Sequence, residues 1–321
     1  MVAGSLTNRE RSSITDSKLR ETVQLAAGSL KAEIVPSLGG GVARFDFLED
    51  KQRIELFRPW PKSGTDDPNL LGLYVLVPWS NRISGVGFRF EGKFHQLTSN
   101  FPGEPCPIHG DGWLSDWSIG SADERSVRLA HVAEGPGPYR YTASLEYVLE
   151  ADGMRIRLAA TNRAPLALPF GLGFHPWLPR TPATLLIAPA KSVWLENARH
   201  LPTERVVIAG RPEWDFESFR SLPSDWINNG FVGWNGRATI LWKDRALALD
   251  VDAQPPLTTY ILYSPSAAAD FFCFEPVSHA VNAHNLPPGP EAHGLVLLKP
   301  GRALVIECTF RVYVPRSAFG V

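Results

Sequence analysis

The sequence predicts an all-β fold, either a sandwich or a barrel of many short strands. Period-two runs of apolar and β-branched residues recur along the chain, and turn residues separate them. The 28 prolines and 27 glycines are spread over the whole length rather than gathered in a linker. Long amphipathic helices and a strand-helix alternation are missing from the pattern, which argues against a parallel sheet.

The expected strands lie at 30–36, 41–48, 87–97, 126–134, 141–150, 154–162, 238–242, 247–253, 258–265 and 303–314. The stretch 146–162 predicts a hairpin, because Asp152-Gly153 is a strong turn signal. Helical signals are few: one or two turns are expected near 215–222 and 224–231.

Neither an internal repeat nor a composition break divides the chain. We therefore expect one domain over residues 22–321, behind a polar and flexible lead-in at 1–21. This lead-in lacks the apolar core of a secretory signal, and no apolar run reaches the roughly 18 residues of a membrane helix. A cytoplasmic location is expected.

Composition narrows the possible functions further. With 32 basic and 33 acidic residues, the net charge of -1 gives no footprint for nucleic acid or for an anionic membrane. Cys106, Cys273 and Cys308 are odd in number and too widely spaced for a zinc motif, which predicts reduced, buried thiols. The 10 tryptophans suit a carbohydrate-binding protein, because sugars stack their C–H faces on aromatic rings.

Three segments combine ionisable groups with glycine and proline, as functional loops do. The first comprises 77–88 and 107–113. Arg82, beside Asn81, could donate a fork of hydrogen bonds to vicinal hydroxyls, or could be an ordinary solvated arginine. His109, next to a glycine that would let a ligand approach, could contact a ligand or make a structural hydrogen bond.

The second segment is 170–179, in which His175 stands among phenylalanine, leucine and tryptophan side chains. Such an imidazole is either satisfied inside the core or lines a pocket. Pro176 favours an extended backbone at His175. The Gly-x-Gly run before it is too short for a nucleotide-binding fingerprint.

The third segment, 270–285, places Glu275 after the apolar run 271–274. A carboxylate there is costly unless it is paired, bound or catalytic, and desolvation would raise its pKa towards that of a general base. His279 and His284 are five residues apart without a helix to align them, so no metal site is predicted. The serine hydrolase motif GxSxG is also missing.

Several motifs, taken in order, resemble bacterial aldose 1-epimerases, the galactose mutarotase-like proteins. They are NRI (81–83), IHG (108–110), GFHPW (173–177), GFVGWNG (230–236) and FCFEPVSHAVNAHN (272–285). The resemblance runs from about residue 22 to about 315. It implies a large antiparallel β-sandwich, the galactose mutarotase-like supersandwich, with an open sugar cleft and no cofactor.

The resemblance also implies roles for matched residues. Glu275 would be the general base and His175 the general acid, while His109 and Arg82 would bind and orient the sugar. Asn81 would give a supporting contact. The family usually carries a substrate-binding aspartate where this chain has Asn228, which leaves the identity of the sugar in question.

We therefore expect an aldose 1-epimerase that interconverts the anomers of a free hexose, acting as a monomer or homodimer with a small-molecule sugar as its partner. The alternatives are a hexose-phosphate epimerase and a non-catalytic sugar-binding protein of the same fold. A hexose-phosphate epimerase needs a cluster of basic side chains to bind the phosphate, and the sequence offers only Arg82, Arg89 and Lys93. A glycosidase or lyase would want a second carboxylate in the cleft.

Overall fold

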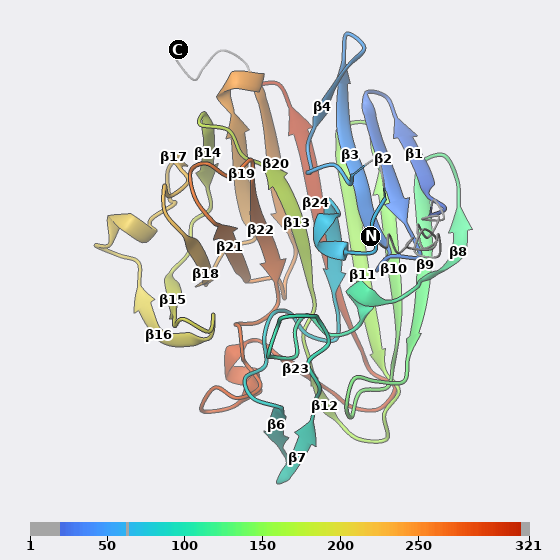
Figure 1. Ribbon diagram of the computed structural model, residues 1–321, viewed down its shortest axis with the longest axis vertical. Coiled ribbons are helices and arrows are strands. Elements are labelled where there is room, and N and C mark those ends of the chain that lie inside the picture. Colours follow the sequence, from blue (N-terminus) through green and yellow to red (C-terminus); the bar gives the residue numbers. More distant parts are fainter. Residues whose placement is uncertain (1–19, 62–63, 316–321) are drawn as a thin grey trace, which may run out of the picture.

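Two large antiparallel sheets pack face to face in the computed structural model, which describes residues 20–61 and 64–315 (Figure 1). The first, of eleven strands, runs in the order β1 (Val23–Ala27), β2 (Leu30–Val35), β3 (Gly41–Glu49), β5 (Leu73–Leu76), β13 (Gly173–Pro179), β22 (Phe271–Val277), β21 (Thr259–Ser264), β18 (Ile227–Val232), β15 (Ser192–Glu196), β16 (Pro202–Val207), with β4 (Gln52–Glu55) paired to β3.

The second sheet, of nine strands, runs in the order β17 (Arg220–Ser221), β14 (Thr184–Ile187), β19 (Arg237–Trp242), β20 (Leu247–Ala253), β24 (Ala303–Tyr313), β11 (Gly153–Asn162), β10 (Tyr141–Leu149), β9 (Ser126–Ala133), β8 (Ser118–Ala122). Two small ribbons pair β12 (Leu168–Phe170) with β23 (Val296–Leu298) and β6 (Gly87–Phe90) with β7 (Lys93–Gln96), the latter projecting at the lower end of Figure 1.

Helical structure in the described residues is limited to 3₁₀ turns. These are η1 (Pro68–Leu70), η2 (Gly112–Leu114), η3 (Pro212–Trp214), η4 (Lys243–Arg245) and η5 (Pro290–His293). None of them is long and apolar enough to cross a membrane. The all-β sandwich with few short helices is therefore confirmed.

Every strand expected from the alternating pattern is present, and 87–97 is the β6–β7 ribbon. The predicted hairpin is β10–β11, with Leu149 opposite Met154. The helical turns expected near 215–222 and 224–231 are wrong: 224–231 leads into and forms most of β18, and the first stretch ends in the short β17. Pairing of β18 with β15 and β21 on its two sides overrides the turn preference of its Asn-Asn-Gly run.

The main core fills the space between the sheets, where inward-facing positions of both sheets interdigitate. A separate apolar cluster lies on the other face of the eleven-stranded sheet. It comprises Tyr74, Leu76, Ile108, Trp113, Trp177, Ile261, Cys273 and Val277. The central strands of this sheet are thus covered on both faces, and this second face carries the site.

The three cysteines are free and buried, as predicted. The lead-in predicted at 1–21 falls almost wholly outside the described residues, since only residues 20 and 21 of it are described.

Candidate active site

His175 and Glu275 lie on adjacent central strands, β13 and β22. These strands pair at Gly173–Val277 and again at Trp177–Cys273 in one register, so His175 lies opposite Glu275. His175 Nε2 is 3.3 Å from Glu275 Oε1. The two side chains are buried, with 8% and 3% exposure. The expectation that 170–179 and 270–285 are loop-like is wrong, because both residues lie within strands.

Proline explains why these strands were hard to recognise. Pro176 and Pro276 each follow a site residue and sit in the interval between the two paired ends of β13 and β22. A proline donates no ladder hydrogen bond and is normally found at sheet edges. The pairing of β13 with β22 is therefore interrupted next to the carboxylate–imidazole contact.

A cross-strand row extends the site in both directions. Tyr74 of β5 is paired with His175, and Ile261 of β21 with Glu275. Beyond Ile261 the row continues to Gly230 of β18 and Trp194 of β15. Side chains paired in this way share a face of the sheet, so the acid–base pair and the far strands look onto one cleft.

Burial acts oppositely on the two members of the pair. Loss of water raises the pKa of Glu275 to about 8, against a smaller lowering by the Arg82 charge. It lowers the pKa of His175 to about 3, because the imidazolium is the form that burial penalises. Between these values the pair holds one proton and is neutral overall. Burial also keeps Tyr74 and Cys273, which flank the pair, protonated by raising their pKa values.

His109 is held beside the pair by a strained loop. His109 and Asn81 both adopt the left-handed region, with φ of 59° and 58°. The Asn81 backbone N–H donates to His109 Nδ1 over 3.0 Å. Burial lowers the pKa of His109 well below its ordinary value, so the ring is neutral and its proton must sit on Nε2. The His109 and His175 ring centroids are 5.3 Å apart.

Gly110, after His109, shows why the loop needs a glycine. Its φ is +69°, and a Cβ there would lie 2.0 Å from the Val77 carbonyl oxygen. The glycine lets the loop press against the end of β5 and bring His109 to the cleft.

Aromatic rings set the orientation of His175. Its ring lies 4.5 Å from Tyr74 and is stacked on Trp177 at 5.2 Å between centroids. Arg58 covers Trp177, with its guanidinium carbon 3.9 Å from the ring centroid. Glu275 Oε2 and Trp177 Nε1 are buried without hydrogen-bond partners among residues 20–61 and 64–315. Sugar hydroxyls are groups that could satisfy such atoms.

Arg82 lies at the rim of the site and forms a salt bridge with Glu104. Its Nε and Nη2 contact Glu104 Oε2 at 2.9 and 2.7 Å. Its Nη1 is 3.4 Å from the Asn81 side-chain oxygen. The guanidinium therefore has part of its fork left for a hydroxyl, while its charge is balanced by a neighbouring carboxylate.

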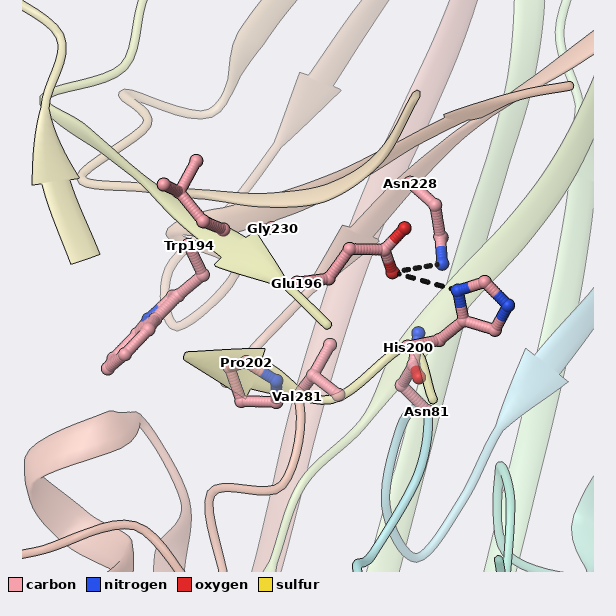
Figure 2. A pocket seen from close by; sticks show the side chains of 9 residues that line it. Asn81, Trp194, Glu196, His200, Pro202, Asn228, Gly230 and Val281 are labelled. Carbon is pink, nitrogen blue, oxygen red and sulfur yellow. Dashed lines mark hydrogen bonds and ion pairs between the residues drawn. The ribbon is translucent and has the colours of Figure 1, made fainter. Parts of the chain in front are cut away.

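Asn228 lies farther along the cleft, in a pocket that it lines together with Asn81, Trp194, Leu195, Glu196, His200, Pro202, Gly230 and Val281 (Figure 2). Its amide nitrogen donates to Glu196 Oε2 over 2.9 Å. Asn81 lines this pocket and also holds His109, so the pocket adjoins the acid–base pair.

In the second half of the 270–285 segment, His279 and Asn282 support the site through hydrogen bonds. His279 Nε2 accepts from the Ser80 backbone N–H over 2.9 Å. Asn282 accepts through its side chain from the Ser84 N–H and donates its own N–H to the Arg82 carbonyl. These bonds fix the Asn81–Arg82 turn. The described residues contain no cluster of potential metal ligands.

Sequence reasoning missed Tyr74, Glu104, Glu196 and His200. Tyr74 and Glu104 carry no local signal. Glu196 and His200 are spaced i,i+4, but without a helix this spacing suggested nothing. The other partners of Glu196, Trp226 and Asn228, lie 30 and 32 residues further along the chain, so only the fold identifies its role.

The molecule is thus an antiparallel β-sandwich whose central strands hold a buried carboxylate–imidazole pair. A sequence profile of the aldose 1-epimerase family matches residues 21–311, and the chain belongs to this family.

Its relatives agree with this membership. YphB of Escherichia coli (strain K12), an uncharacterized protein, is 36% identical over 294 residues, covering 90% of this chain and 97% of YphB. A crystal structure from Escherichia coli K12, described as a candidate aldose 1-epimerase, superposes with a TM-score of 0.84 at 34% identity, covering 92% and 99% of the two chains. A galactose mutarotase-like protein from Clostridium acetobutylicum shares the fold, with a TM-score of 0.80 at 19% identity over 92% and 95%.

Proposed function

We propose that this protein is a mutarotase that interconverts the α and β anomers of a free hexose by acid–base opening and closure of the ring. The observation that carries the proposal is the buried 3.3 Å contact between His175 Nε2 and Glu275 Oε1. Mutarotation requires one base and one acid at adjacent oxygens, and this pair offers both.

The reaction begins when the Glu275 carboxylate takes the proton of the C1 hydroxyl. Protonated His175 gives its proton to the ring oxygen, the bond from C1 to that oxygen breaks, and C1 becomes an aldehyde. After rotation about the C1–C2 bond, the former ring oxygen attacks the other face of C1. His175 then takes back its proton and Glu275 returns the other, so no atom or charge is lost.

The one-proton state of the pair suits this cycle. The arrangement of carboxylate with imidazolium and the arrangement of carboxylic acid with neutral imidazole contain the same number of protons. Burial favours the neutral arrangement, which is the state reached on ring opening. The bound sugar must therefore favour proton transfer from Glu275 to His175 before opening, through hydroxyls that solvate the carboxylate.

His109 and the rim residues would orient the sugar. The His109 Nε2–H is a donor available to an oxygen of the substrate, and the remaining Arg82 N–H groups can reach a vicinal hydroxyl. Asn81 and Asn228 would contact the sugar from the adjoining pocket. Each contact helps hold C1 and the ring oxygen over the acid–base pair.

A hexose-phosphate epimerase is less well supported. Arg82 is paired with Glu104, while Arg89 and Lys93 lie on the exposed β6–β7 ribbon, where Arg89 lies over Phe94. These three residues therefore form no clamp for a phosphate. The carboxylate of Glu196 in the adjoining pocket would also repel an anionic group.

Polarimetry tests the proposal directly, with freshly dissolved α-D-glucose and α-D-galactose as substrates. Wild type is expected to accelerate the change in rotation on at least one sugar. Glu275→Gln should lower kcat by about 10²–10⁴-fold, because it removes one proton-transfer group. The exposed Glu204→Gln on β16 is the matched control and should behave as wild type. Near-normal kcat in Glu275→Gln would refute the role of Glu275.

A further inference from the structure

We infer that Glu196 is the positioning residue of a second subsite in the cleft, which selects neutral sugars through the hydroxyls remote from C1. This inference rests on the proposed function and adds to it a substrate class. The observation behind it is a single partly buried carboxylate that gathers three side-chain donors around one pocket.

The donors come from two parts of the chain: His200 lies four residues after Glu196, and Trp226 and Asn228 lie around the start of β18. Glu196 Oε1 accepts from Trp226 Nε1 over 2.7 Å. Glu196 Oε2 accepts from Asn228 Nδ2 over 2.9 Å and lies 3.1 Å from His200 Nδ1 (Figure 2). With three of about four acceptor positions occupied, the main effect of the carboxylate is to fix the groups around it.

This arrangement decides what the pocket offers a ligand. Because an ionised carboxylate can only accept, the Asn228 atom facing Glu196 is the amide nitrogen, which leaves the amide oxygen as an acceptor. His200 Nδ1 faces Glu196, so Nε2 on the other side of the ring is left for a ligand. Hydroxyl groups, which both donate and accept, match both atoms.

The position of the subsite fits the other end of a single sugar ring. Gly230, which lines the pocket, lies two strands from Glu275 in the row that runs through Ile261. Two strand spacings are roughly 10 Å, and the side chains project into this span from both ends. A hexose held with C1 over Glu275 would direct its far hydroxyls toward Asn228 and His200.

Aromatic walls complete the subsite. Trp194 lines the pocket, and Trp226, which is 48% exposed, stacks on His200 with ring centroids 5.2 Å apart. An exposed indole and a half-buried one beside fixed polar groups suit a sugar, whose C–H face packs on a ring while its hydroxyls reach the polar groups.

The carboxylate of Glu196 disfavours anionic sugars, and Arg205 lies over the Trp194 ring, 6.0 Å from its centroid, rather than against this carboxylate. In the part of the chain that the structure describes, Glu196 has no ion pair with lysine or arginine, and His200 is its one basic contact. A phosphate or carboxylate placed on this end of the sugar would meet an acidic pocket. The subsite should therefore prefer glucose to glucose 6-phosphate.

A charge-exchange experiment tests the inference by calorimetric titration, which measures binding whether or not the sugar turns over. D-glucose and D-galactose are titrated into wild type, Glu196→Gln, Asn228→Asp and the double variant. Each single change should weaken binding of the preferred sugar about tenfold or more. Asn228→Asp sets two carboxylates face to face, whereas the double variant restores one amide beside one carboxylate.

The double variant should therefore bind more tightly than either single variant, which a loss of independent contacts cannot produce. Glu204→Gln, exposed on β16, removes the same charge nearby and should leave binding within twofold of wild type. Thermal unfolding of each variant separates loss of binding from loss of fold. In polarimetry, the single variants should raise KM more than they lower kcat.

The result that overturns the inference is binding by Glu196→Gln and Asn228→Asp within twofold of wild type, or additive losses in the double variant. Equal affinity of wild type for glucose and glucose 6-phosphate, or no binding of either hexose, also overturns it. A wild type that binds sugar through Glu196 but does not accelerate mutarotation would refute the proposed function alone.

Discussion

Two pairs of buried histidines in this molecule are alike in exposure and differ in the use of their nitrogens. His109 and His175 are 5% and 6% exposed, and His279 and His284 are 1% and 4% exposed. Burial lowers the pKa of all four rings. Exposure and charge state therefore do not separate a reactive histidine from a structural one.

Hydrogen bonding does separate them. Both ring nitrogens of His279 contact the backbone. Nε2 accepts from the Ser80 N–H, and Nδ1 lies 2.8 Å from the Ala280 carbonyl oxygen. His284 Nε2 is 3.0 Å from the Tyr139 hydroxyl. Both rings therefore have a structural role, holding neighbouring segments together through hydrogen bonds.

The other pair keeps nitrogens for the cleft. His175 directs Nε2 at a carboxylate that titrates in the opposite direction, and His109 leaves its Nε2–H for a ligand. The difference teaches that the partner of each ring nitrogen, rather than burial, marks a histidine that can move protons.

The comparison is tested most severely by His175→Asn. Loss of the acid should lower kcat by about 10²–10⁴-fold. The melting temperature should change little, because the substitution removes a contact with the Glu275 side chain rather than a hydrogen bond that holds two backbone segments together. Polarimetry at saturating sugar gives kcat, and circular dichroism gives the melting curve. A variant with wild-type kcat would place His175 in the structural class.

His279→Asn should show the reverse. It leaves the Ser80 N–H or the Ala280 carbonyl without its partner, at a cost of about 1–3 kcal/mol in the free energy of unfolding. The loss of kcat, measured on the folded protein, should be far smaller than for His175→Asn. Urea unfolding measures the first quantity. If His279→Asn were stable but inactive, the division between the two pairs would be wrong.

The pH dependence of the free energy of unfolding is a smaller effect that also distinguishes the two pairs. The pKa of Glu275 is raised from 4.5 to about 8 on folding, so its contribution is lost as pH rises towards 8. The pKa of His175 falls from 6.5 to about 3, so its contribution is lost as pH falls towards 3. Between 4.5 and 6.5 the two slopes cancel.

From pH 6.5 to 8 only the Glu275 term acts, and wild type should lose up to about 2 kcal/mol relative to Glu275→Gln. Urea unfolding of both proteins across this window measures the difference. A wild type that gains stability relative to the variant as pH rises would show that Glu275 is charged in the folded free protein.

The fold could be predicted where local pattern and pairing agree. The alternating runs at 141–150 and 154–162 form β10 and β11. Along both strands, polar side chains point outward and apolar side chains point into the core. The strands that build the site were harder: β13 is buried throughout and contains Pro176 and Pro179, and β22 contains Pro276. Their strand geometry is set by neighbours on both sides rather than by local preference.

The site divides in the same way. Glu275 and His175 stood out because an ionisable group in an apolar run is costly without a purpose. Glu196 carries no local signal, since its role depends on Asn228, 32 residues away, and on Trp226. A local sequence pattern holds no record of such a contact until the sheet order is known.

The pH profile of kcat/KM tests the central claim most directly, because it reports the pKa values of the free enzyme. The rate on the better hexose is measured from pH 5 to 10, with the uncatalysed rate subtracted. A pair that shares one buried proton predicts a flat profile through neutral pH and a fall centred near 8. A fall centred near 6.5, the ordinary value for histidine, would show that His175 titrates independently of Glu275 and would contradict the account.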